Sequence, residues 1–216
     1  TSLARQLQDA QRMLREAMTP EMQAALQRLE GATQELNGDR TRQSLSDLAQ
    51  QQQKMREQLE KSAEMLKRAA LEGAMQTLGD QARELAQAQQ QFADSARAGQ
   101  PDAQRAEQRA QQLAQQTRQM SEQMQALQER LERERANTGA TQSERAQEEA
   151  RRSEAALQEA MRQSREAQQG PQGSAQRQQA QQGARDAAEQ AAQAMQQAAQ
   201  SMQRARQGQV SEWKGE

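Results

Sequence analysis

The sequence predicts an all-α fold of long antiparallel helical hairpins in a coiled-coil bundle, with about six helices and no sheet. Gln and Ala fill roughly two-fifths of the 216 residues, and Ala and Gln, like Glu, Arg, Leu and Met, favour helices. The chain has no Ile or Tyr and a single Val, so residues that strands prefer are nearly absent. Apolar residues recur at alternating spacings of three and four, which is the heptad pattern of paired helices.

Residues 1–38 are expected to form a short helical pair. The seam of the first helix, meaning its apolar heptad positions, consists of Leu3, Leu7, Ala10, Leu14 and Ala17. Thr19 suits a helix N-cap and Pro20 suits the first helical position. The seam of the second helix consists of Met22, Ala25, Leu29, Ala32 and Leu36. Asn37-Gly38 is a helix stop or turn signal.

Residues 39–136 are expected to form a long helical hairpin. Its first arm runs from Thr41 to Arg97 and has the seam Leu45, Leu48, Gln52, Met55, Leu59, Ser62, Leu66 and Ala69, continued as Leu71, Met75, Leu78, Ala82, Leu85, Gln89, Phe92 and Ala96. Gly73 and Gly79 lie where the phase changes, and the sequence leaves open whether the helix breaks there. The second arm has the seam Ala106, Ala110, Leu113, Thr117, Met120, Met124, Leu127 and Leu131.

Residues 137–207 are expected to form an Ala/Gln-rich helical pair. Asn137-Thr138-Gly139 is interpreted as a stop, and Thr141 with Glu144 as a capping box that opens the next helix. That helix has the seam Ala146, Ala150, Ser153, Leu157, Ala160 and Ser164. A break at residues 170–173 precedes a last helix with the seam Ala184, Ala188, Ala191, Met195, Ala198, Met202 and Ala205. An Ala seam buries little apolar area, so stability is expected to fall toward the C-terminus. Residues 208–216 are expected to be a frayed tail.

The residue types of the chain argue against a catalytic or metal-binding function. The chain has no His and no Cys, which removes the commonest general bases, thiol nucleophiles and transition-metal ligands. The carboxylate pairs Glu148-Glu149 and Glu132/Glu134 are predicted to be solvated helix faces, because acid–base pairs need an enclosing pocket. The Gly-Pro-Gln-Gly sequence at 170–173 lacks the Lys-Ser/Thr of a phosphate cradle. We therefore predict no catalytic, cofactor-binding or metal-ligating residue, and a protein that is not an enzyme.

Charge and hydropathy restrict the partners. The net charge of −1 gives no basic face for nucleic acid, and no apolar run is long enough to span a bilayer. We expect protein partners or self-association through the heptad seams. Trp213, the only Trp, is interpreted as a loose tail residue, or alternatively as an anchor on another domain or a membrane interface. The chain opens at Thr1 rather than Met, from which we expect a fragment or processed product.

One stretch resembles a known family. It contains Thr19-Pro20-Glu21-Met22-Gln23 followed by Leu26, Leu29, Leu36 and Leu45, then Gln58-Leu59-Glu60-Lys61, Met65-Leu66-Lys67-Arg68 and Leu71-Glu72. These residues, within about 18–92, resemble the Gln-rich coiled-coil region of a bacterial family of large, uncharacterised membrane-anchored proteins. The resemblance implies a location on the extracytoplasmic side of the cell envelope, with an anchor upstream; a cytoplasmic location stays open.

The expected role is structural. A non-catalytic coiled-coil segment of a larger cell-envelope protein would act as a spacer or a protein-assembly surface, with helix length fixing distances and seams choosing partners. The alternative is a surfactant-like amphipathic protein whose helices open and lay their apolar stripes on a lipid or granule surface.

Overall fold

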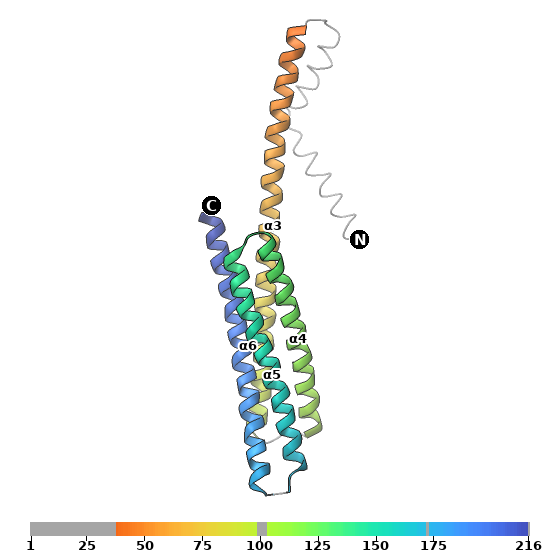
Figure 1. The fold of residues 1–216 in the computed structure, drawn as a ribbon, viewed down its shortest axis with the longest axis vertical. Helices are drawn as coiled ribbons and strands as arrows, with labels where there is room; N and C mark the ends of the chain where they lie inside the picture. The colour runs from red at the N-terminus through yellow and green to blue at the C-terminus, as the bar shows by residue number, and fades with distance from the viewer. Residues whose placement is uncertain (1–37, 99–102, 172, 216) are drawn as a thin grey trace. The chain divides into compact units, whose positions relative to one another are not determined.

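A computed structural model describes residues 38–98, 103–171 and 173–215, and all helices in this part of the chain are α-helices. They are α3 (Gly38–Arg97), α4 (Ala103–Arg133), α5 (Asn137–Gln169) and α6 (Ala175–Gly215) (Figure 1). No strand occurs in these residues, so the expectation of an all-α fold is confirmed for them. The two helices expected within 1–37 lie outside the described residues. The chain divides into two units, residues 1–67 and 68–216.

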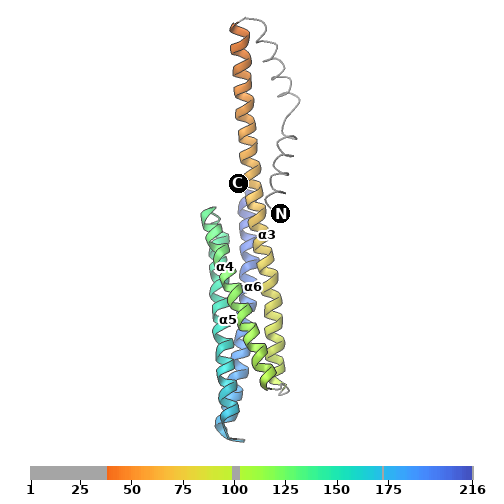
Figure 2. The same ribbon diagram turned by 90° about the vertical axis from the view of Figure 1, so that its right-hand side faces the viewer.

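The second unit is an antiparallel four-helix bundle. It consists of α3 from Arg68 onward together with α4, α5 and α6, and consecutive helices run in opposite directions (Figures 1 and 2). α5 packs against both α4 and α6, and ion pairs and core contacts join α3 to α6. This is the up-and-down arrangement that short connections favour. Of the helices that lie wholly within this unit, α6 is the longest, with 41 residues, which is about 62 Å at 1.5 Å per residue.

The heptad seams predicted from the sequence form the interior of this bundle. In α4, every seam position from Ala110 to Leu131 is buried. The α5 seam is buried from Ala146 to Ala160, and the α6 seam from Ala188 to Ala205. The largest fully enclosed apolar side chains are Met75, Leu113, Met124, Leu131, Leu157, Met195 and Met202. The prediction of which residues on each helix face the neighbouring helices is therefore confirmed for the second unit.

α3 does not break at either of its internal glycines. The helix continues through Gly73 and Gly79 to Arg97. A Cβ placed on Gly79 would lie 3.5 Å from the Cβ of Met202 on α6. That distance is an ordinary van der Waals contact, so the packing of α3 against α6 does not require a glycine at this position.

The turn between α4 and α5 differs from the sequence prediction. α4 ends at Arg133, and Asn137-Thr138-Gly139 form the first turn of α5 instead of a stop. Arg135 adopts a left-handed φ of 56°. The Ala136 amide donates to the Leu131 carbonyl at 2.8 Å and the Arg135 amide to the Glu132 carbonyl at 3.0 Å. These two bonds make a Schellman motif, which ends α4 without a glycine.

The predicted capping box at Thr141 is also wrong, because α5 begins four residues earlier at Asn137. The residue before the helix is Ala136, which has no capping side chain. The Gly139 amide, an otherwise orphan donor of the first turn, instead donates to Gln209 Oε1 at 2.9 Å. A distant residue of α6 thus replaces the local cap.

The expected frayed tail is helical, since α6 continues to Gly215. Tertiary contacts explain the difference. Gln209 is 1% exposed and caps α5, and a Cβ on Gly208 would lie 2.8 Å from the Thr138 methyl group. Trp213 packs against the core of the bundle. These contacts hold a segment in which the sequence shows no apolar periodicity.

The break at 170–173 is confirmed. α5 ends at Gln169 and α6 begins at Ala175. Ser174 caps α6, because its Oγ accepts a hydrogen bond from the Arg177 amide at 3.2 Å, the third helical position that an N-cap serves. Gly173 supplies a left-handed φ of 78° within the turn.

The core changes composition along the bundle axis. One cluster of buried residues contains the Leu and Met side chains of all four helices. A smaller cluster consists only of alanines, Ala93, Ala160, Ala187 and Ala188, with Phe92 against it. Because Ala160 lies near the end of α5 and Ala187 and Ala188 lie near the start of α6, the alanine cluster lies toward the end of the bundle where α5 turns into α6.

Candidate functional site

The strongest candidate in the bundle interior is a buried polar triad, Gln89, Thr117 and Ser153. Each residue comes from a different helix, α3, α4 or α5, and each is fully buried. Gln89 Nε2 donates to Thr117 Oγ1 at 2.8 Å, and Ser153 Oγ donates to Gln89 Oε1 at 2.9 Å. Thr117 Oγ1 donates in turn to the Leu113 carbonyl at 2.7 Å. Every hydrogen bond in this chain of contacts has ordinary geometry.

The polar triad offers structural specificity and not chemistry. It contains two hydroxyls and an amide, with no base to activate a hydroxyl and no group that titrates near neutral pH. Sliding any one of these three helices along its axis by one turn would leave buried polar groups of the triad without hydrogen-bond partners. A polar residue at a seam position in each of the three helices was visible from the sequence, but the sequence could not show that the three positions meet.

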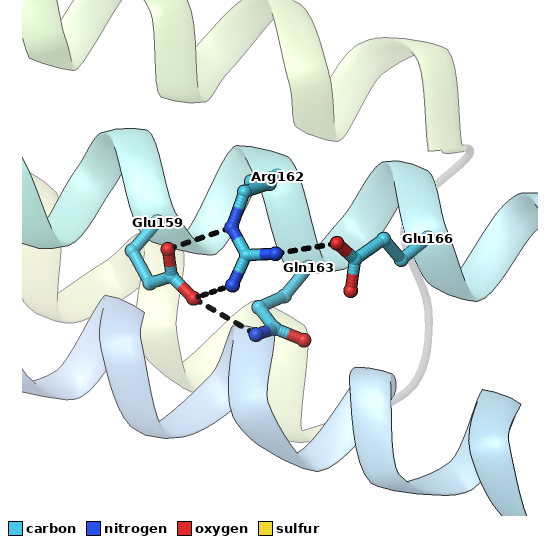
Figure 3. Close-up of polar contacts among 4 residues, drawn as sticks. All are labelled: Glu159, Arg162, Gln163 and Glu166. Atoms are coloured by element: carbon cyan, nitrogen blue, oxygen red, sulfur yellow. Dashed lines mark hydrogen bonds and ion pairs between the residues drawn. The ribbon is translucent and has the colours of Figure 1, made fainter.

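A second candidate is the exposed cluster on α5 around Arg162 (Figure 3). Arg162 Nε donates to Glu159 Oε2 at 2.9 Å, and Gln163 Nε2 donates to Glu159 Oε1 at 2.8 Å. These hydrogen bonds, that from Arg162 first, lower the pKa of Glu159 to about 2. Glu159 in turn raises the pKa of Arg162, with a smaller contribution from Glu166. A carboxylate this acidic stays ionised at neutral pH and accepts protons only weakly, so it is poorly matched to general acid or base catalysis there.

Further ion pairs join helices across the bundle surface. Arg206 on α6 contacts Glu72 on α3 at 3.0 Å, and Arg165 on α5 contacts Glu107 on α4 at 2.6 Å. Arg97 also pairs with Glu189 of α6. All these side chains are partly solvated, so each pair contributes little stability and mainly supports the choice of neighbouring helix.

The carboxylate pairs that the sequence singled out lie on helix surfaces. Glu132, Glu134 and Glu148 are exposed. Glu149 is less exposed and pairs with Arg152 at 2.7 Å. In the described part of the chain, no three Asp or Glu side chains converge as a metal site would require.

The surface grooves of the bundle are lined by few residues that could bind a ligand specifically or catalyse a reaction. The groove between α3 and α6 has a volume of about 400 Å³, and its lining is Ala and Gln apart from Arg83. A groove between α3 and α4, of about 440 Å³, includes Glu84, Leu85 and Arg109 beside further glutamines. Ligand sites usually enclose their ligand between apolar walls, whereas these grooves are lined largely by the amide side chains of glutamines.

Trp213 is neither a loose tail residue nor a free anchor. It lies partly buried on the bundle core, and the Arg68 guanidinium stands 5.7 Å from its ring centroid, a cation–π distance. Arg68 Nη1 also contacts the Trp213 carbonyl at 3.5 Å. The pair therefore joins the end of α6 to α3.

Comparison with protein-family models, curated proteins and solved structures gave no match. Among the described helices, none has the length and apolar character needed to cross a bilayer.

Proposed function

We propose that this chain is a non-catalytic structural segment of a larger bacterial cell-envelope protein, acting as a spacer or protein-assembly surface. The observation that best supports this proposal is that the apolar seams of the second unit are buried inside its own bundle. In the described residues, the large exposed apolar side chains are Leu45, Leu59, Met65 and Leu66, and all four belong to the first unit. The bundle surface is left to Gln, Arg and Glu, which suits a solvated rod.

The buried polar triad supports a fixed length. Buried polar contacts are best attested as devices that select one register among otherwise similar apolar packings. The Ala and Met seams of this bundle would pack nearly as well after a slip of one heptad, but the triad would then lose its partners. A single register gives one length, and a spacer requires one length.

The location rests on the resemblance of residues 18–92 to the coiled-coil region of membrane-anchored bacterial proteins. A spacer between an envelope anchor and a distal domain would need no catalytic group, cofactor or metal. The surface ion pairs and the Gln-rich exterior would keep such a rod soluble without a large net charge.

The alternative is a surfactant-like protein that coats a lipid or granule surface. The exposed Leu45, Leu59 and Leu66 favour it, because an amphipathic helix can lay such a stripe on an interface. Opening the bundle, however, would expose its Leu and Met core and break the hydrogen bonds of Gln89. We therefore favour the spacer.

Spin labelling tests the two functions in one sample. The substitutions Gln116→Cys on α4 and Gln193→Cys on α6 fall at exposed positions. They would introduce the only two cysteines of the chain, which has no native Cys. The spacer predicts a single narrow label–label distance by pulsed electron paramagnetic resonance, unchanged by vesicles of anionic phospholipid. A longer or broader distance in the presence of vesicles than in their absence, together with co-flotation of the protein with the vesicles, would instead establish the coat.

A further inference from the structure

A short segment of α3, residues 68–80, contains both glycines that lie between the ends of this helix. Glycine is the poorest helix former after proline, because its backbone loses the most conformational freedom on folding. A Cβ on Gly73 would meet nothing within 4 Å, and a Cβ on Gly79 would make only an ordinary contact with Met202. The packing of the bundle therefore requires a glycine at neither position, although both glycines weaken the helix.

A threonine weakens the same segment. Thr77 Oγ1 donates to the Gly73 carbonyl at 2.9 Å. A hydroxyl that bonds back to the preceding turn competes with the helical hydrogen bond there and often bends the helix, and sharp bends also concentrate at glycines. Thr77 and Gly73 are both exposed, so this hydrogen bond lies on the solvent side of α3. The sequence of the segment thus favours a bend at Gly73, whereas the structure shows a continuous helix.

The C-terminal part of α6 contacts α3 just before Gly73. Arg206 Nε and Nη2 both donate to Glu72 Oε1, at 3.2 and 3.0 Å. The Trp213 ring packs against the core and lies 5.7 Å from the Arg68 guanidinium. All four side chains are partly exposed, and solvated ion pairs and cation–π contacts contribute much less stability than buried leucines or methionines. These contacts can therefore break while the core of the bundle stays folded.

We infer that the C-terminal part of α6 is a releasable clasp that keeps the glycine-weakened segment of α3 straight. With Arg206 and Trp213 in contact, residues 68–80 form part of one helix. When these two side chains release α3, residues 68–72 swing about Gly73, while Met75, which is fully buried, stays in the core. The clasp does not depend on the proposed spacer role. It adds a conformational switch between a straight and a bent α3.

Hydrogen exchange of the full chain, followed by mass spectrometry, tests the clasp. Arg206→Gln removes the ion pair and Trp213→Leu removes the aromatic ring. Each variant should speed exchange of the amides of residues 73–77 by about tenfold, because local opening exposes these amides, while peptides around Leu157 of α5 keep their protection. Arg204→Gln is the matched control, since Arg204 lies on the same helix at an exposed position; this substitution should leave exchange in α3 unchanged.

A second background tests the role of the glycines. Gly73→Ala combined with Gly79→Ala strengthens the helix, and both added Cβ atoms have room. In this background, Arg206→Gln and Trp213→Leu should speed exchange of the same amides by roughly twofold or less.

Three outcomes would overturn the inference. Equal acceleration with and without the two alanines would show that the α6 contacts act as ordinary packing and that the glycines play no part. Unchanged exchange in both Arg206→Gln and Trp213→Leu would show that α6 does not hold this segment. Protection lost equally in α3 and α5 would show that these contacts hold the whole bundle and not one segment.

Discussion

Two serines on α5 give a matched test of how the bundle interior treats polar groups. Ser143 and Ser153 are both fully buried and both face the bundle interior from the same helix. Ser153 Oγ donates to Gln89 Oε1 at 2.9 Å, whereas Ser143 Oγ has no hydrogen-bond partner. We predict that Ser153→Ala destabilises the bundle and that Ser143→Ala stabilises it.

The magnitudes follow from the satisfied and unsatisfied hydroxyls. Removing Ser153 Oγ leaves the Gln89 carbonyl oxygen buried without its donor, which costs about 2 kcal/mol. Removing the unpartnered hydroxyl of Ser143 relieves a burial penalty of about 1 kcal/mol. Both variants gain the same small helix propensity from alanine, so it cancels in the comparison. The two variants should therefore differ by about 3 kcal/mol.

Thermal unfolding measures the difference. Trp213 packs on the bundle core and is the only Trp, so its fluorescence reports the second unit without a contribution from the first. At about 2–4 °C per kcal/mol for a unit of this size, the Tm values should differ by roughly 6–12 °C, with Ser143→Ala the higher. Equal Tm values, or the reverse order, would refute the assignment of these hydrogen bonds.

Three further predictions concern the seam, the surface and the core gradient. Leu127→Ala should lower the bundle Tm strongly, at a cost of about 3 kcal/mol for a buried leucine, while Glu129→Ala on the exposed face should change it little; similar Tm shifts would place the seam elsewhere. Arg162→Met should raise the pKa of Glu159 from about 2 toward its ordinary value, as followed by side-chain carboxyl NMR. Because folding lowers this pKa, the associated stability is present above the ordinary pKa and is lost as pH falls from about 4.5 to about 2; an unchanged Glu159 titration in the variant would contradict the ion pair. Within α6, amides next to the alanine cluster should exchange hydrogen faster than those around Met195, and uniform exchange rates by mass spectrometry would show that alanine packing compensates for the lost apolar area.

The sequence alone determined that the described part of the chain is helical and which residues line the interior of the bundle. Heptad spacing is a local property, since residues three and four apart share a face on any helix. The seam from Leu113 to Leu131 and the seam from Ala188 to Ala205 could therefore be predicted without knowing their partners. The break at 170–173 was equally local, because glycine and proline interrupt a helix by their own backbone preferences.

Only the tertiary structure decided the helix ends, the position of the alanine cluster and the meeting of the polar residues. α5 begins at Asn137 because Gln209 caps Gly139 from a helix far along the chain, and α6 extends to Gly215 while Trp213 packs on the core and against Arg68. The sequence predicted that stability falls along the chain. Antiparallel packing brings alanines of α3, α5 and α6 together in one cluster, so we expect the gradient to follow the bundle axis instead. The polar triad needed three helices in one register. Such contacts depend on which helices become neighbours, and a repeating heptad pattern is nearly the same for every choice of neighbour.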